Sequence, residues 1–171
     1  MTKTQSVIVE DLFLTDTFLI KGRLANKFQR LAKMLEDTDS GFLQVEDAAM
    51  ISLRGTDVIH TPRVLINPKE LILAHELVDI AGDSTFRQLA DNEKPVRIRA
   101  FYNGVVQLEL SGRIEEKAYL PQDRGGRNYF TMEKPVLRGL RFETNQDLEI
   151  LKGLGYAIIR KDKLAYVYDF S

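Results

Sequence analysis

The sequence predicts a mainly β protein with a few short helices, built as two tandem small antiparallel β-barrels related by internal duplication. Similar segments recur in the same order in both halves of the 171 residues. Each half also holds about five short stretches of alternating apolar and polar residues, which is typical of strands. The segments with helical spacing are short and fall between these stretches. This combination is typical of small barrels or sandwiches.

The repeat consists of three pairs of similar segments. In chain order the pairs are separated by 90, 87 and 93 residues, and they comprise 22–24 with 112–114, 42–48 with 129–135, and 64–77 with 157–170. The differences in spacing fall in the connections, where insertions cost little. We therefore predict a first barrel unit at 1–81, a partly helical linker at 82–95 and a second barrel unit at 96–171.

The first unit begins with a predicted hairpin from Val7 to Leu24, with its turn at Thr15 and Asp16 and with Phe18 on the inner face. Apolar residues at helical spacing then predict an amphipathic helix over 26–37. A strand at 42–48 follows. The apolar triplet, polar turn and alternating strand of 64–77 complete the unit.

In the second unit, residues 96–102 and 106–111 alternate between apolar and polar, and Asn103-Gly104 predicts a two-residue hairpin turn between them. Residues 117–128 contain Pro and Gly and are predicted to form a loop. Thr144 is predicted to cap a short helix that ends at Gly153. The closing segment 157–170 repeats the end of the first unit.

These units resemble the Sm-like (Src-homology-3-like) small barrel, because 65–73 and 158–166 are similar to its second sequence motif. Residues 30–35 and 41–48 are also similar to an uncharacterised bacterial domain family of this barrel type. RNA-binding Sm-like proteins carry a basic Gly- or His-containing turn in that motif. Here only the turn at 160–163 is basic, and it contains no His. The resemblance therefore implies the fold rather than RNA binding.

The formal net charge of −1 provides no overall attraction to nucleic acid or to an anionic membrane. The charge is uneven, because residues 1–85 carry −4 and residues 86–171 carry +3. No apolar stretch has the length of a signal peptide or a membrane span, which predicts a cytoplasmic protein. The absence of Cys excludes disulfides and thiolate chemistry.

No arrangement of residues predicts catalysis, a metal or a cofactor. The two His residues, His60 and His75, lack partners at ligand spacing and are predicted to lie on the surface or at the edge of the core. The sequence has no nucleophile elbow, phosphate-binding loop or dinucleotide fingerprint. We therefore expect a protein that is not an enzyme.

The main binding candidates lie in a Gly-rich loop and in the last turn. Two Arg that flank two Gly and precede an aromatic can bind a phosphate or carboxylate and stack on a base. The same pattern is also typical of a flexible loop tip. The candidates for binding an anion or nucleic acid are Arg124, Gly125, Gly126, Arg127, Tyr129, Lys161 and Lys163.

Two further sets of basic residues have simpler alternative explanations. The secondary basic surface, which can also be the solvated face of a helix, comprises Lys21, Arg23, Lys27, Arg30 and Lys33. Residues Arg97, Arg99 and Arg113 are expected to form cross-strand ion pairs with neighbours such as Glu109. The late aromatics are typical of strand faces or of an edge that meets another barrel, and they comprise Tyr156, Tyr166, Tyr168 and Phe170.

We therefore expect a non-enzymatic binding or assembly module of two fused barrels that acts through protein contacts. Small barrels leave edge strands that must be covered, and strand addition between copies covers them. The expected partner is the protein itself, as a homo-oligomer. The alternative is binding of RNA or another nucleic acid through the basic second half.

Overall fold

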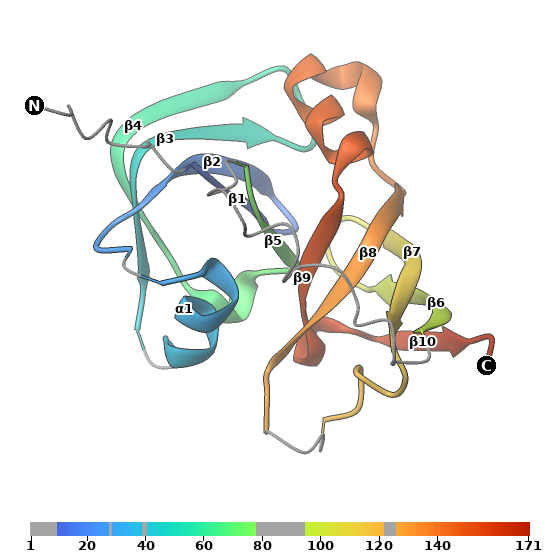
Figure 1. Ribbon diagram of the computed structural model, residues 1–171. Coiled ribbons are helices and arrows are strands. Elements are labelled where there is room, and N and C mark those ends of the chain that lie inside the picture. The colour runs from blue at the N-terminus through green and yellow to red at the C-terminus, as the bar shows by residue number, and fades with distance from the viewer. Residues whose placement is uncertain (1–9, 28, 39–40, 78–94, 122–125) are drawn as a thin grey trace, which may run out of the picture.

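The computed structural model describes residues 10–27, 29–38, 41–77, 95–121 and 126–171 (Figure 1). Most of the predicted linker at 82–95 therefore lies outside the described residues. Within the described ranges, no helix combines the length and the apolar character that crossing a membrane requires.

Ten strands hold about half of the residues that the structure describes, which confirms the predicted mainly β class. The first half contains β1 (Asp11–Leu14), β2 (Phe18–Leu24), α1 (Leu31–Asp37), β3 (Leu43–Ser52), β4 (Val58–Ile66), η1 (Pro68–Glu70) and β5 (Leu73–Glu76). The second half contains β6 (Pro95–Tyr102), β7 (Leu108–Glu115), β8 (Tyr129–Arg138), η2 (Phe142–Thr144), η3 (Gln146–Gly153), β9 (Tyr156–Arg160), η4 (Lys161–Lys163) and β10 (Tyr166–Asp169).

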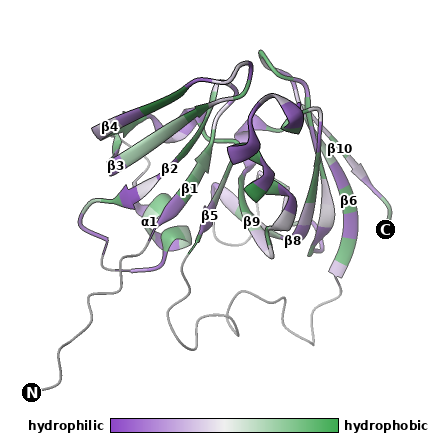
Figure 2. Cartoon of the chain, turned by 90° about the horizontal axis from the view of Figure 1, so that it is seen from above, coloured by the Kyte–Doolittle hydropathy of each residue, from purple (hydrophilic) through white to green (hydrophobic). Residues whose placement is uncertain are grey.

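All ten strands belong to one antiparallel sheet with the order β10-β6-β7-β8-β9-β5-β1-β2-β3-β4. Each half contributes five consecutive strands, and in each half the last strand pairs with the first. The halves are joined where β9 pairs with β5. Seen from above, these two strands lie side by side between the halves (Figure 2). The sheet is continuous and not closed, so two separate closed barrels stay a prediction.

The strand pairings of the first half recur in the second half in the same register. Leu14 lies opposite Leu73, and Phe101, 87 positions after Leu14, lies opposite Tyr166, 93 positions after Leu73. The β2–β3 register shifts between Lys21 and Arg23, and the β7–β8 register shifts 90 positions later. The two halves therefore have the same path of strands and the same bulge.

The hydrophobic core continues across the junction between the halves. One cluster holds Leu12 and Leu73 of the first half together with Ile98 and Ile159 of the second. Neighbouring residues such as Phe13 belong to a second cluster, which also contains Tyr156 and Ile158 of the second half. Successive side chains of a strand point to opposite faces, so β1, β5 and β9 contribute to both clusters. These central strands are therefore buried on both faces.

Three local predictions are wrong in detail. The helix begins at Leu31 rather than at residue 26, because Asn26 adopts a left-handed conformation with φ of 55°. The Asn103-Gly104 hairpin has a longer turn, since Tyr102 pairs with Leu108. The side chain of Asn145, rather than that of Thr144, caps η3 by accepting the Asp147 N–H at 3.1 Å.

The longer hairpin turn results from packing against the first half. The carbonyl oxygen of Val105 accepts a hydrogen bond from the Arg54 guanidinium at 3.0 Å. Gly104 lies against the Asp16 side chain. These contacts hold the β6–β7 turn against the β1–β2 and β3–β4 turns, so tertiary contacts determine its shape.

Candidate functional site

The junction between β5 and β9 is the structural feature on which the functional argument depends. Leu73 lies opposite Ile159 and Ala74 lies opposite Ile158. The backbone N–H of Arg160 donates to the Ile72 carbonyl at 3.3 Å. Apart from the half-buried His75, every residue of both strands is buried, which suits strands with another layer on each face.

Polar contacts continue along this junction. The Tyr156 hydroxyl accepts the backbone N–H of Glu76 at 3.1 Å, and the His75 ring lies 4.5 Å from the Tyr156 ring, centroid to centroid. At the other end, Lys163 Nζ lies 3.5 Å from the Glu70 carboxylate. This ion pair connects η4 with η1. The junction is therefore an extensive interface between two similar units.

The start of β8 is also bound to the first half. The Glu36 carboxylate on α1 accepts the backbone N–H groups of Asn128 and Tyr129, at 3.0 and 2.9 Å. The Tyr129 ring is buried, and its hydroxyl accepts a hydrogen bond from Arg160 at 2.8 Å. Arg160 is itself buried and paired with Asp162 at 2.6 Å. The predicted stacking residue Tyr129 therefore belongs to the core.

The other main binding candidates that the structure describes differ in their exposure. Arg124 and Gly125 lie outside the described residues, while Gly126 and Arg127 are exposed. Lys161 is buried, and its ammonium donates to the Leu120 carbonyl at 3.1 Å. Lys163 pairs with Glu70, as described above. The side chains of Lys161 and Lys163 in the turn at 160–163 therefore make contacts within the fold.

The secondary basic surface is also largely neutralised. Lys21 lies 3.6 Å from Glu10, and Arg23 is paired with Asp47. Lys27 lies in a mostly buried position before the helix, with its ammonium 2.8 Å from Asp11 and 3.6 Å from Glu76. Arg30 precedes the helix, and Lys33 is exposed on it.

Asp11 is fully buried on β1. One of its carboxylate oxygens faces Lys27, and the other, Oδ2, has no hydrogen-bond partner among the described residues. Burial raises the pKa of Asp11, although the hydrogen bond and the charge of Lys27 act in the opposite direction. The equivalent position in the second half is the apolar Ile98.

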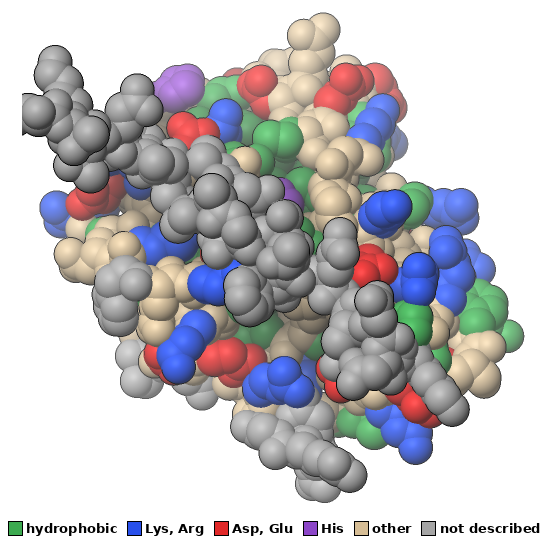
Figure 3. All heavy atoms as spheres, viewed as in Figure 1, with side chains coloured by type: hydrophobic (Ala, Val, Ile, Leu, Met, Phe, Trp, Pro, Cys, Tyr) green, Lys and Arg blue, Asp and Glu red, His purple; other side chains and the backbone are tan. Residues whose placement is uncertain are grey.

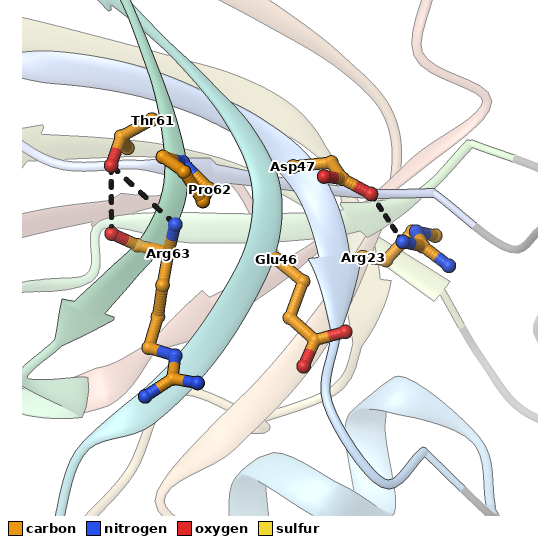
Figure 4. A pocket seen from close by; sticks show the side chains of 6 residues that line it. All are labelled: Arg23, Glu46, Asp47, Thr61, Pro62 and Arg63. Carbon is orange, nitrogen blue, oxygen red and sulfur yellow. Dashed lines mark hydrogen bonds and ion pairs between the residues drawn. The ribbon is translucent and has the colours of Figure 1, made fainter.

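An open pocket of about 430 Å³ lies at the bulge of the first half. Its lining residues are Arg23, Glu46, Asp47, Thr61, Pro62 and Arg63, and Arg23 is turned toward Asp47 (Figure 4). The lining combines two Arg with two carboxylates. Among the described residues, no three potential metal ligands come together.

The two strands at the ends of the sheet, β4 and β10, are each paired on one side only within the described part of the chain. Both expose large hydrophobic side chains, which are Ile59 and Leu65 on β4 and Tyr166 and Tyr168 on β10. Phe170 continues the row after β10, and its ring lies 4.6 Å from that of Tyr168. The sequence singled out the aromatics of this row, but it did not single out Leu65, because an apolar strand residue is usually buried.

The outer face of the second half combines basic and aromatic side chains. Arg99 pairs with Glu109 at 2.6 Å, as predicted, and Arg113 lies 3.9 Å from Glu133. The hydrogen bond from Arg99 holds the pKa of Glu109 below its usual value. Lys and Arg side chains gather on the right of Figure 3, where the strands of the second half lie in Figure 1.

No family model matches the sequence, and neither the curated proteins nor the solved structures contain a match to this chain. The resemblance to Sm-like barrels therefore stays a prediction.

Proposed function

We propose that this protein is a non-enzymatic assembly module whose copies join head to tail, by pairing β4 of one copy with β10 of the next. The proposal includes the origin of the chain as two small barrels related by duplication. The recurring register of the strand pairings supports that origin. The observation that carries the proposal is the β9–β5 pairing inside the chain.

The internal junction joins the fourth strand of one unit to the last strand of the other. In the second half the fourth strand is β9, and in the first half the last strand is β5. The remaining fourth and last strands are β4 and β10, which are the two edges of the sheet. Pairing them between copies repeats a contact that the fold already makes. It also covers edge backbone groups that otherwise invite non-specific pairing.

The charge distribution favours the same arrangement. Residues 1–85 carry a net charge of −4, and residues 86–171 carry +3. In a head-to-tail arrangement each first half meets a second half, so the neighbouring units have opposite charges. Two first halves brought together repel each other. This attraction promotes encounter and orientation more than it increases affinity.

Light scattering of the purified chain across the micromolar range tests the proposal. We expect the average mass to rise with concentration, and we expect Tyr168→Lys to lower it by placing a charge on the β10 edge. Val136→Lys is the matched control, because Val136 is exposed on β8 in the interior of the sheet. A chain that stays monomeric over the whole range would overturn the proposal.

Nucleic-acid binding is a second candidate, supported by the outer face of the second half. There Arg97 and Arg138 are exposed, and Phe101 lies opposite the exposed Tyr166. Arg and aromatic side chains on a strand face suit the backbone and bases of a single strand. Affinity for single-stranded RNA should fall with salt and with Arg97→Ala plus Arg138→Ala. The absence of binding at low ionic strength excludes this candidate.

A further inference from the structure

We infer that the joint between copies repeats the residue register of the internal β9–β5 junction, so that Leu65 of one copy lies opposite Val167 of the next. This inference rests on the proposed assembly and specifies its interface. The occupant of each open edge is a second copy of this chain. Three observations carry the inference.

The first observation is the constant spacing between equivalent strands. In the first half Val64 on β4 pairs with Val45 on β3. In the second half Ala157 on β9 pairs with Met132 on β8 in the same way. The strands β4 and β9 therefore correspond to each other, and equivalent residues are 93 positions apart. The strands β5 and β10 correspond at the same spacing.

This spacing transfers the internal register to the joint between copies. Inside the chain, Ala74 on β5 lies opposite Ile158 on β9. Their equivalents are Val167 on β10 and Leu65 on β4. In the same way, the Leu73–Ile159 pair becomes Tyr166 opposite Ile66.

The second observation is that hydrophobic residues are exposed at positions whose equivalents are buried in the internal junction. On β10 the relative exposure of Tyr166 is 65%, whereas that of Leu73, its equivalent on β5, is 1%. Tyr168 and Phe170 are also more than half exposed. Their equivalents, His75 and Leu77, are only partly exposed, and the His75 ring lies against Tyr156 of the second half.

The opposite end of the sheet, formed by β4 and the neighbouring β3, shows the same contrast, with Leu65 on β4 and Phe42 just before β3. Phe42 and Leu65 are 62% and 53% exposed. Their equivalents Tyr129 and Ile158, 87 and 93 positions later, are 5% and 3% exposed because they pack against the first half. Both ends of the sheet therefore present the hydrophobic residues that the internal junction buries. A second copy is the partner that supplies the matching surface at both ends.

The third observation is charge. Extending the register by two residues places Arg63 of one copy opposite Asp169 of the next. Inside the chain the equivalent residues are Tyr156 and Glu76, which are in contact. Asp169 also accepts a hydrogen bond from the Tyr119 hydroxyl at 2.7 Å, which holds the carboxylate in place at the edge. Opposite charges at directly facing positions stabilise an antiparallel pair.

Disulfide cross-linking can test this register, because the chain contains no Cys. Two single variants, Leu65→Cys and Val167→Cys, are mixed and oxidised. We expect a covalent dimer in the mixture, because directly opposed residues lie within the distance that a disulfide spans. Neither variant alone should form this dimer efficiently. The control mixture is Leu65→Cys with Val136→Cys, whose second thiol lies away from the edge.

The outcomes separate the register from the proposed function. If light scattering shows association but the mixture gives no more dimer than the control, the register is wrong while assembly stands. If Leu65→Cys alone forms the dimer, two β4 edges face each other and head-to-tail pairing is wrong. If the unmodified chain does not associate, both proposals fail. Circular dichroism of each variant shows that it is folded.

Charge reversal provides a second test that does not depend on oxidation. We expect Arg63→Glu to weaken association about tenfold at low salt, and Asp169→Lys in the partner chain to restore most of the loss. Reversal of the unrelated exposed Lys33 (Lys33→Glu) is the control. An Arg63→Glu chain that associates as strongly as the unmodified one would overturn the Arg63–Asp169 pairing.

Discussion

The glycines at the two bulges show how one residue determines the path of two strands. A Cβ atom on Gly112 would lie 2.6 Å from Met132 Cγ and 2.8 Å from the Glu133 carbonyl oxygen. A Cβ atom on Gly22 would lie 2.6 Å from Val45 Cγ1 and 2.8 Å from a carbonyl oxygen. Contacts this close require a hydrogen in place of a side chain. The same constraint therefore operates twice in the chain.

We expect Gly112→Ala to lower the free energy of unfolding by about 1–3 kcal/mol, because the added methyl group must displace backbone as well as Met132. Gly155→Ala is the control, since a Cβ atom there would meet nothing within 4 Å. Urea unfolding of both variants measures the difference. Equal stability of the two variants would contradict the close approach at the bulge.

Asp11 gives the folded protein a characteristic pH dependence. Its pKa is raised above the ordinary value of 3.8, mainly by burial. The folded state therefore binds the Asp11 proton more tightly than the unfolded state does. As pH rises above 3.8 the carboxyl loses this proton, and the free energy of unfolding falls. Asp11→Asn removes this titrating group. The free energy of unfolding of the variant, compared with that of the unmodified chain, should therefore increase as the pH is raised from acidic to neutral.

Urea unfolding over that pH range measures the effect. The control is Asp57→Asn, which removes an exposed carboxylate. A stability difference between the unmodified chain and Asp11→Asn that stays constant with pH would contradict the raised pKa.

Residue chemistry alone did not predict where Tyr129 lies in the fold. An aromatic after a Gly-rich, Arg-containing segment suits a stacking site, but Tyr129 begins a buried strand and bonds to Arg160. The decisive contacts come from Glu36 and Arg160, which are distant in sequence. No local sequence pattern around residue 129 predicts these contacts.

At the scale of elements, similar apolar triplets occupy different environments. Residues 64–66 lie on the edge strand β4, whereas residues 157–159 lie on the central strand β9. Alternation, turns and repeated segments predicted the mainly β class and the closing turns. They did not predict that β9 pairs with β5, because hydrophobic patterns identify a buried strand without identifying its neighbour.

The helix α1 connects the halves through a single carboxylate. We expect Glu36→Gln to lower the free energy of unfolding by about 1–3 kcal/mol, because an amide has one carbonyl oxygen in place of two charged acceptors. Lys33→Gln, an exposed change on the same helix, is the control. Chemical unfolding measures both. An effect of Glu36→Gln no larger than that of the control would contradict the connecting role.

At the scale of the whole molecule, the shared core limits the independence of the halves. Leu12, Leu14 and Leu73 of the first half belong to the same cluster as Ile98 and Leu110 of the second. Separating the halves would expose the apolar side chains of this cluster to water. Units of about 80 residues have little stability to lose.

We therefore expect residues 1–81 and 96–171, produced separately, to lack a cooperative unfolding transition and to regain it when mixed. Circular dichroism during thermal unfolding checks both statements, with the intact chain as the reference. A cooperative transition in either half alone would show an independent domain and contradict the role of the shared core.

The two open edges differ from each other, since one belongs to the first half and the other to the second. A head-to-tail assembly built from such a chain has a direction, with a free β4 at one end and a free β10 at the other. A copy blocked at only one edge can still join through its other edge and then stops growth there. A small fraction of such blocked copies would therefore limit the average length of an open assembly, because each one ends the assembly that it joins.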